Sequence, residues 1–227
     1  MTTIASALPL LGLRVNAGPL ELRGITDELL GPLADIAVAG IHDSGSMPFF
    51  VPWSIAPAEV LPRQFAQYHW SQRAAFSPAG WSLDLAVFWE GELVGVQGMS
   101  TKDYLVTRTG ETGSWLGRSH QGKGIGTAMR QVFCAFAFDH LDATQITSGA
   151  FTDNPASLGV SRKVGYRENG LRRVERRPGE LAVVQGLQLA PEDLVRFAHP
   201  LEVEGLEPFR VLVGLERSRS PLAAARA

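Results

Sequence analysis

"HQGKGIGTAM", residues 120–129, places three glycines at alternate positions directly before residues that favour helices. Beyond this segment, apolar side chains recur at the i, i+3, i+4 and i+7 spacing of an amphipathic helix, at Met129, Val132, Phe133 and Phe136. The spacing predicts a helix over residues 127–141 that packs on a sheet. The glycine loop therefore ends at the amino end of a helix.

The amino end of a helix attracts anions. Its first backbone N–H groups have no partner within the helix, and the helix dipole adds about half a positive charge there. An anion such as a phosphate would therefore receive several hydrogen bonds from this loop at once. Glycines at 122, 124 and 126 leave no side chain between the amides and the anion. The alternative is a flexible turn that is glycine-rich by chance, because short glycine motifs occur often.

Two common nucleotide-binding motifs do not fit the segment. A Walker loop needs a lysine followed by Ser or Thr, whereas Gly124, Ile125 and Gly126 follow Lys123. A Rossmann fingerprint needs a third glycine where Thr127 stands, and an acid at the end of the next strand, which "TQITSGAF" lacks. The strands predicted before the loop form hairpins rather than βαβ units. The evidence for either nucleotide-binding motif is therefore weak.

Composition predicts a single globular domain. The 227 residues are 45% hydrophobic and carry a net charge of -2, which suits a protein with a sizeable core. We expect one domain over residues 1–215 and a disordered tail over residues 216–227. The near-balanced charge argues against a nucleic-acid or membrane partner, and without a membrane span or secretory signal we expect a cytoplasmic protein. The single cysteine, Cys134, excludes an internal disulfide and indicates no metal site.

Alternating apolar residues predict strands along most of the chain. Two short strands are expected around a turn within residues 13–26, followed by strands at residues 81–89, 93–100, 112–117 and 145–151. The segment "GLEPFRVLVGL", residues 205–215, also alternates. We expect it to pair as a strand with the sheet or with a second subunit of a homodimer.

Helical spacing and capping residues predict two helices between the first two strands and the strand at residues 81–89, and one helix after the strand at residues 145–151. The first starts near Thr26 or Asp27, the second covers residues 58–76 and ends before Pro78, and the last begins at Asp153 or Asn154. A loop rich in proline and aromatic residues, "HDSGSMPFFVPW", separates the first two. It could wall a binding site, or its aromatic residues could belong to the core or to a subunit contact.

Two motifs together are more specific than the glycine loop alone. The pattern Q/R-x-x-G-x-G/A occurs within "SWLGRSHQGKGIGTAMR", and "TDNPASLGVSRKVGYRENG" follows it. Over residues 13–190 the chain resembles the GNAT superfamily of N-acetyltransferases, and more narrowly its RimJ/RimL-type branch, whose members acylate protein or peptide N-termini and small amines. Much of the remaining chain, including "MPFFVPW", resembles an actinobacterial group of these enzymes for which succinyl-CoA has been proposed as donor.

The resemblance implies a fold and a cofactor site. The implied fold is α/β (α+β), a mixed and mostly antiparallel sheet of about six to seven strands with helices on both faces, splayed at the acyl-CoA site. The diphosphate of acetyl-CoA or succinyl-CoA is expected on the loop residues Gln121, Gly122, Lys123, Gly124, Ile125, Gly126 and Thr127. The pantetheine arm is expected along the strand at Trp115, Leu116 and Gly117, with a bulge at Gly117.

The second motif implies the residues nearest the thioester. By resemblance Asn154 binds the pantetheine arm, and Ser157 binds near the thiol and protonates the leaving thiolate. The alternative for Ser157 is a polar residue that merely caps the helix. Cys134 falls within the predicted amphipathic helix, where a small buried residue is more common than a catalytic thiol.

An amine acceptor arrives as ammonium and must lose a proton before it attacks the thioester. Glu111 stands where the family strand carries a glutamate, and a partly buried carboxylate with a raised pKa could serve as the base. It could equally be an ordinary exposed turn residue. The reserve candidates are His120, which more readily holds phosphate or packs, Asp84 and Glu168.

Three functions follow from these motifs. The first is transfer of an acetyl group from acetyl-CoA to a protein N-terminus or small amine, and the second uses succinyl-CoA with the same mechanism. A succinyl carboxylate needs a cation or hydroxyl, and residues 42–57 contain no Lys or Arg, which leaves Arg63, Arg73 and Lys102. The third is an inactive module that binds acyl-CoA as a sensor.

Overall fold

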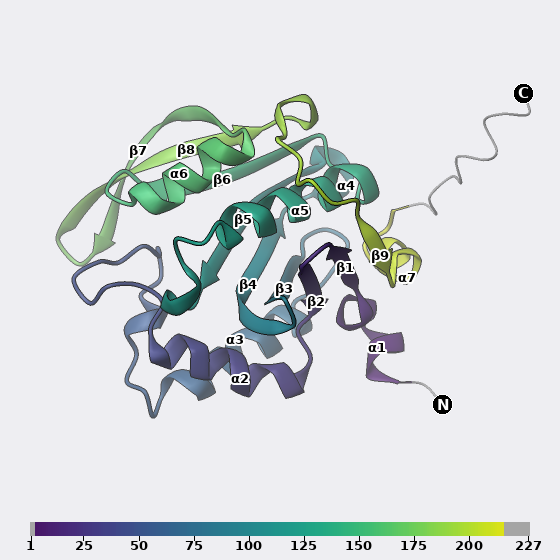
Figure 1. Cartoon of the computed structure of the whole chain (residues 1–227), viewed down its shortest axis with the longest axis horizontal. Coiled ribbons are helices and arrows are strands. Elements are labelled where there is room, and N and C mark those ends of the chain that lie inside the picture. Colours follow the sequence, from purple (N-terminus) through teal and green to yellow (C-terminus); the bar gives the residue numbers. More distant parts are fainter. Residues whose placement is uncertain (1–2, 216–227) are drawn as a thin grey trace, which may run out of the picture.

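The computed structural model describes residues 3–215, so the predicted tail lies outside the described residues (Figure 1). The described part of the chain forms one sheet of nine strands in the order β7-β8-β6-β5-β4-β3-β2-β1-β9. The strands are β1 (Arg14–Ala17), β2 (Leu20–Gly24), β3 (Ser82–Trp89), β4 (Glu92–Thr101), β5 (Thr109–Leu116), β6 (Gln145–Phe151), β7 (Arg167–Arg177), β8 (Glu180–Leu189) and β9 (Glu202–Glu204).

Every neighbouring pair of strands is antiparallel except β5 and β6, which are parallel. The predicted mixed, mostly antiparallel fold class is therefore confirmed, with nine strands instead of six to seven. The early hairpins and β5 and β6 fall where the alternation predicted them. The additions are the long β7–β8 hairpin and the three-residue β9.

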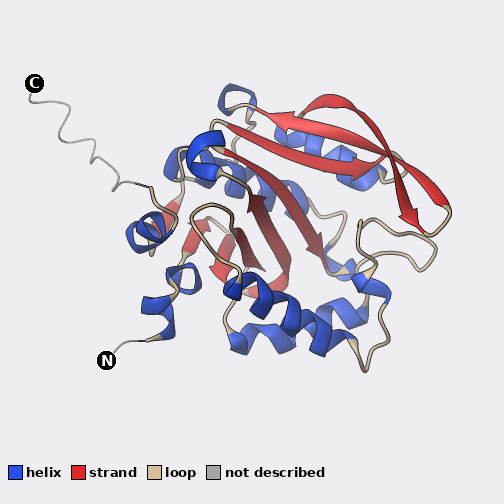
Figure 2. Cartoon of the chain, turned by 180° about the vertical axis from the view of Figure 1, so that it is seen from behind, coloured by secondary structure: helices blue, strands red, loops and turns tan. Residues whose placement is uncertain are grey.

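Helices cover both faces of the sheet (Figures 1 and 2). The helices are α1 (Ile4–Ala7), α2 (Asp27–Ala39), α3 (Leu61–Ala74), α4 (Tyr104–Thr107), α5 (Ile125–His140), α6 (Pro155–Val164) and α7 (Leu206–Leu212). We call the side covered by α5 and α6 the α5 face, and the side covered by α2 and α3 the α2–α3 face. Each face has its own apolar core cluster.

The central helix α5 is buried along almost its whole length. Val132, Phe133 and Phe136, three of the apolar residues that predicted it, have no exposed surface. Burial of each such side chain contributes about 1.5–3 kcal/mol of hydrophobic free energy, so this helix anchors the larger core. It begins at Ile125, two residues earlier than predicted, because Gly124 adopts a left-handed conformation and takes the cap position.

The sheet splays between β5 and β6. Their parallel pairing runs only from Thr109 opposite Gln145 to Thr112 opposite Ser148. Beyond that point β5 stays paired with β4 as far as Leu116, and β6 stays paired with β8 as far as Phe151. Each strand follows its antiparallel neighbour, so the twist of the two halves opens a gap that begins at Gly113.

The predicted bulge at Gly117 is wrong. The register between β4 and β5 runs without a shift up to Leu116, and Gly117 follows the end of the strand with a φ of -53°. The gap thus comes from the early end of the β5–β6 pairing rather than from an extra residue in β5.

The predicted strand over residues 205–215 is also wrong. Gly205, at a φ of +74°, starts the helix α7, and only β9 just before it pairs with the sheet, beside β1. Phe209 and Val213, four residues apart, are both fully buried, which is the i, i+4 spacing of a helix. The homodimer that this strand suggested stays a prediction. No helix within residues 3–215 is long and apolar enough to cross a membrane.

Candidate active site

The glycine loop presents bare backbone at the start of α5. Gly122 and Gly124 have φ values of +74° and +86°, a region that favours glycine, and a side-chain carbon built at either position would meet no atom within 4 Å. The amides of residues 122–126 donate to no group among the described residues. Together these amides form an exposed cradle of donors at a helix amino end, which suits a diphosphate.

Thr127 differs from the other cradle residues. Its amide already donates to the carbonyl oxygen of Gly124, at 3.0 Å. Its contribution to an anion would therefore come from the hydroxyl. Lys123 is exposed and pairs with no carboxylate among residues 3–215, so its charge remains available to a ligand.

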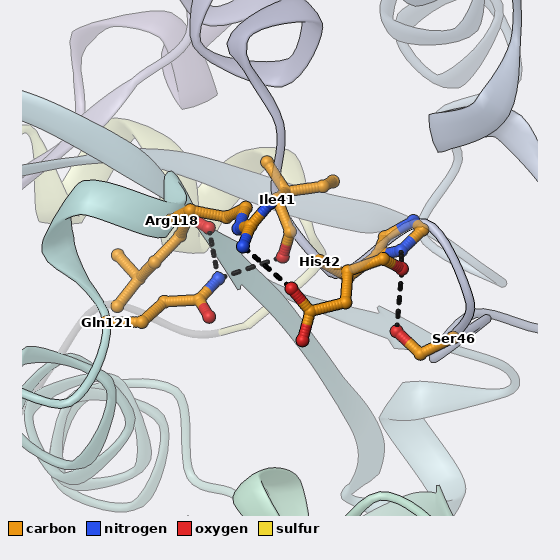
Figure 3. A network of polar contacts seen from close by, with 7 residues as sticks. Ile41, His42, Ser46, Arg118 and Gln121 are labelled. Atoms are coloured by element: carbon orange, nitrogen blue, oxygen red, sulfur yellow. Dashed lines mark hydrogen bonds and ion pairs between the residues drawn. The ribbon is translucent and has the colours of Figure 1, made fainter.

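Gln121 fastens the cradle to two other parts of the chain (Figure 3). Its side-chain amide donates to the carbonyl oxygens of Ile41, at 2.8 Å, and Leu116, at 2.9 Å. Beside it, the Arg118 guanidinium pairs with Asp43 at 2.7 Å. Both contacts hold the loop after α2 against the end of β5, so Gln121 positions the cradle through its side chain.

One stripe of α5, from Gly126 to Arg130, lies between β5 and α6, and we call these residues and their neighbours on β5 and α6 the corridor. Gly126 lies between Leu116 of β5 and Val160 of α6, because a side-chain carbon built on it would sit 3.7 and 3.6 Å from them. One turn later, the Arg130 guanidinium donates to Ser114 of β5 at 2.7 Å and to Ser161 of α6 at 3.1 Å.

Arg130 is an unusual wall residue. Only 5% of it is exposed, its Nε has no hydrogen-bond partner, and no carboxylate of the described chain pairs with it. A buried cation without an anion is costly, so a negatively charged or strongly polar ligand in the corridor would stabilise it. This position was not predictable from the sequence, because the burial of Arg130 depends on the packing of β5 and α6 against α5.

The amino end of α6 lies at the same gap. The Asn154 Oδ1 accepts a hydrogen bond from the Ser157 amide at 3.1 Å, which caps the helix as predicted. Pro155 occupies the first helical position. Ser157 shares a helix face with Val160 and Ser161, at i+3 and i+4, and these contact α5. The half-buried Ser157 hydroxyl is therefore on the side of α6 that faces the corridor.

A model of the acetyltransferase (GNAT) domain family matches residues 20–167. The chain belongs to the GNAT acetyltransferase family. The resemblance predicted from the two motifs is thus confirmed for the family. The link to an actinobacterial group with succinyl-CoA donors stays a prediction.

Relatives and solved structures agree with this assignment. The YdaF protein of Bacillus subtilis (strain 168), named as a candidate ribosomal N-acetyltransferase, is 29% identical over 91 residues, which are 40% of this chain and 49% of that protein. The aligned part of the chain thus spans about half the length of this relative.

Two solved structures share the fold. RimL, a ribosomal L7/L12 alpha-N-protein acetyltransferase in complex with coenzyme A, superimposes with a TM-score of 0.61 at 18% identity, over 76% of this chain and 94% of that one. Mycobacterium smegmatis RimJ in complex with CoA-disulfide gives 0.62 at 20% identity, over 89% and 93%.

The expected pantetheine strand of the GNAT fold is partly committed to other bonds. The Leu116 carbonyl accepts from Gln121, and the Gly117 amide donates to Val94 at 2.9 Å. Beyond Thr112, however, the edge of β5 that faces the gap has no strand partner. A ligand amide at Trp115, Leu116 or Gly117 would have to use the groups that remain.

Cys134 is a core residue of this GNAT domain, as the alternative to a catalytic thiol predicted. It is fully buried one turn beyond Arg130 and contacts the Tyr166 hydroxyl at 3.4 Å, which in turn bonds Thr112 at 2.8 Å. Burial raises the pKa of the Cys134 thiol to about 11. A thiol that stays protonated at neutral pH is a poor nucleophile.

Glu111 lies on the α2–α3 face and is exposed. The prediction that it acts as the general base assumed a partly buried carboxylate. A side-chain carbon built on Gly149 would lie 3.7 Å from its Oε1 and 3.9 Å from the Phe50 ring. Glu111 and Phe50 therefore both lie beside Gly149 of β6. Of the reserve bases, His120 lies 3.6 Å from Glu92, and Glu168 is exposed on the edge strand β7.

The aromatic residues of the loop after α2 divide between the core and the gap, and the prediction that the loop walls a binding site stays a prediction. Phe49 and Trp53 join the α2–α3 core, with Trp53 5.8 Å from Trp115 between ring centroids. Phe50 instead is 45% exposed and packs on Phe151, at 5.0 Å, beside the gap. The loop thus contributes two aromatic residues to the core and one to the side of the gap.

Cations near the gap differ from those expected. The Arg172 guanidinium of β7 lies 5.9 Å from the Phe50 ring. Arg73 is bound to Asp27 and to the Ile25 carbonyl, while Arg63 and Lys102 are exposed. The described residues contain no cluster of three or more His, Cys, Asp or Glu residues that could hold a metal ion.

Proposed function

We propose that this protein transfers an acetyl group from acetyl-CoA to a primary amine, at a protein N-terminus, on a peptide or on a small amine, by direct attack in a ternary complex. The observation that carries the proposal is the cradle of unpaired amides at residues 122–126, joined by a corridor to a gap through the sheet. We place this activity in the cytoplasm.

The chain's own groups would hold the donor by its backbone and phosphates. The cradle amides and Lys123 would bind the diphosphate, and the unpaired edge of β5 would bind the amides of the pantetheine arm. Arg130 would give the corridor a positive charge beneath Ser114. The donor supplies an activated thioester carbonyl, which an uncharged amine attacks while coenzyme A leaves as the thiol.

We propose that two residues at the start of α6 help the leaving group. Asn154 has an amide nitrogen without a partner within residues 3–215, because only its oxygen caps the helix. That nitrogen would donate to the pantetheine arm. Ser157, one turn before the residues that contact α5, would supply the proton that coenzyme A needs at sulfur.

The test is release of free thiol from purified protein with acetyl-CoA and a panel of amines, including N-terminal peptides and polyamines. We expect thiol release that depends on the amine, with binding of coenzyme A measured separately by calorimetry. Binding of coenzyme A without thiol release on any amine would overturn the proposal and favour an inactive acyl-CoA sensor.

Succinyl-CoA is the second candidate donor, and Arg172 is the observation that favours it. Its guanidinium lies beside Phe50 at the gap, where it could bind the carboxylate of a succinyl group. If succinyl-CoA is the donor, Arg172→Gln should lower kcat/KM for succinyl-CoA about tenfold or more and leave acetyl-CoA unchanged. An equal effect on both donors contradicts this assignment.

A further inference from the structure

A row of bare backbone crosses the α2–α3 face beside the gap. Asp84 of β3 lies opposite Gly98 of β4, which lies opposite Gly113 of β5. Gly113 is exposed, and a side-chain carbon built on it would meet no atom within 4 Å. On the far side of the gap stands another glycine, Gly149 of β6. The main chain therefore carries no side chain of its own at Gly98, Gly113 and Gly149, and of these three positions only the space above Gly113 is open.

The Asp84 carboxylate reaches over this row toward the gap. A side-chain carbon built on Gly98 would lie only 1.9 Å from the Asp84 Oδ1. The carboxylate thus occupies the space that a residue at 98 would need. Neighbouring strands lie about 4.8 Å apart, so Oδ1 stands one strand away from the open space above Gly113. An amine above Gly113 would therefore reach Oδ1 through one water molecule, and an amine between Gly98 and Gly113 would reach it directly.

Neighbouring rows limit the opening. Val96 and Trp115 form the next row and pack under α2 and α3. On the other side, Ser100 and Glu111 are exposed. Beneath the row, the buried Gln97 side chain donates to the carbonyl oxygens of Gly98 and Gly113, at 3.1 and 3.2 Å. The opening is therefore a small window with a fixed floor.

The surroundings of Asp84 suit a proton acceptor. Its side chain is 20% exposed. Among residues 3–215, the titratable or charged groups that contact it or line the same small cavity come from α3: Tyr68, whose hydroxyl donates to Oδ2 at 3.3 Å, His69, at 3.9 Å, and Arg73. Burial raises the pKa of Asp84 to about 6, while the bond from Tyr68 lowers it. Burial, with a smaller effect of Arg73, lowers the pKa of His69 to about 4, so this imidazole is neutral at pH 7.

We propose that the acceptor binds as an ammonium above Gly98 and Gly113 and gives its proton to Asp84, directly or through one water molecule. This inference rests on the proposed N-acyltransferase function. The nitrogen lone pair then forms the bond to the acyl carbon, the carbon–sulfur bond breaks, and sulfur takes a proton from Ser157. The nitrogen loses its second proton through water to Ser157, which restores the hydroxyl and leaves a neutral amide. The proton on Asp84 leaves to solvent through the cavity beside His69.

The wild-type pH profile and Asp84→Asn test the proposal. For wild type we expect kcat/KM to rise with pH up to about 6, the ionisation of Asp84, and then level off. Asp84→Asn should lower kcat/KM at pH 7.5 about 100-fold or more and remove that inflection, with unchanged affinity for coenzyme A. Glu111→Gln, on the exposed neighbouring row, tests the other candidate base: it should keep the inflection near pH 6, and loss of the inflection in this variant would contradict the assignment of Asp84.

Two further variants and a second acceptor separate a base from a structural role. Tyr68→Phe should move the inflection to higher pH, because the Tyr68 hydroxyl lowers the pKa of Asp84. Gly113→Val should raise KM for the amine by filling its site. A weakly basic amine such as methoxyamine, uncharged at pH 7, should lose much less rate in Asp84→Asn than an ordinary amine does.

The outcomes distinguish this inference from the proposed function. If wild type releases no thiol with any amine, the function itself fails. If wild type is active but Asp84→Asn keeps its rate and inflection, or loses equal rate with both kinds of amine, the assignment of Asp84 is wrong. In the latter case Glu111→Gln shows whether the other carboxylate is the base.

Discussion

The candidate sites on the two faces of the sheet consist of different chemical groups. On the α5 face, the cradle consists of main-chain groups, and the corridor beside it comes from two continuous stretches, residues 114–130 and 157–161. On the α2–α3 face, the window depends on side chains from separate segments, with Asp84, Tyr68 and Phe50 gathered around three glycines. A ligand common to a family can be held by backbone, whereas an individual acceptor needs side chains.

The largest expected effect is the loss of coenzyme A binding on the α5 face. Gly124→Glu should weaken coenzyme A binding about 1000-fold, because it puts a side chain and a negative charge into the cradle at a φ of +86°. Calorimetric titration with coenzyme A measures it. Gly170→Glu is the matched control, since this glycine has a φ of +78° and open space on the β7–β8 hairpin. A variant at 124 that binds normally would refute the cradle.

The next effect concerns stability on the α2–α3 face. The pKa of Asp84 rises from 3.8 to about 6 on folding, chiefly through burial. Between these values the unfolded chain loses the proton while the folded chain keeps it. The contribution of this carboxyl is therefore complete below pH 3.8 and is lost as the pH rises through about 6. Two pKa units correspond to at most about 3 kcal/mol.

Asp84→Asn should therefore stabilise the protein at pH 8 by up to about 3 kcal/mol, and far less at pH 4. Urea unfolding at both pH values measures the free energy of unfolding. His69, whose pKa is lowered on folding, destabilises both proteins at acid pH alike. A variant that is less stable than wild type at pH 8 would contradict the burial argument for Asp84.

Ser157→Ala tests the proposed proton donor at the gap, where the two faces meet. We expect kcat to fall about 30-fold through loss of a proton donor, with coenzyme A affinity and stability unchanged. Folding is preserved because the cap uses the backbone amide of residue 157 and not its hydroxyl. Steady-state thiol release measures the rate, and Ser157→Thr should restore part of it. An unaltered rate would leave Ser157 as a polar surface residue.

The smallest effect separates two tasks of Asn154. Asn154→Ala should lose the cap and destabilise the protein by about 1 kcal/mol, whereas Asn154→Ser should keep the cap. If the amide nitrogen binds the pantetheine arm, both variants should weaken coenzyme A binding by a similar factor of about ten. Thermal unfolding and calorimetry measure the two quantities. Normal binding by Asn154→Ser would remove the residue from the ligand site.

The sequence predicted the α5 face well because its information is local. The glycines, the apolar spacing that follows them and the Asn-Pro cap each act within a few residues. Hence α5, α6 and the cap at Asn154 were located within about two residues. The bulge at Gly117 failed because the gap arises where two strand pairings diverge, which depends on the twist of the whole sheet.

The α2–α3 face could be predicted only in part, because strand register decides it. Asp84 gains its place from lying opposite Gly98 and Gly113, residues from two other strands, so the sequence offered it only as a reserve candidate behind Glu111. The segment at residues 205–215 failed for a different reason. Its apolar residues fit both a period of two and a helical period, and contact with the core selected the helix.

The pairing of β1 with β9 sets an order for assembly. Arg14 lies opposite Glu204, so the outermost strand of this half of the sheet comes from the far end of the described chain. While the chain is being synthesised, the β1 edge stays open until residue 204 has left the ribosome. An exposed strand edge invites intermolecular pairing, so the nascent protein is expected to need shielding late in translation, after its ligand-binding helices have already formed.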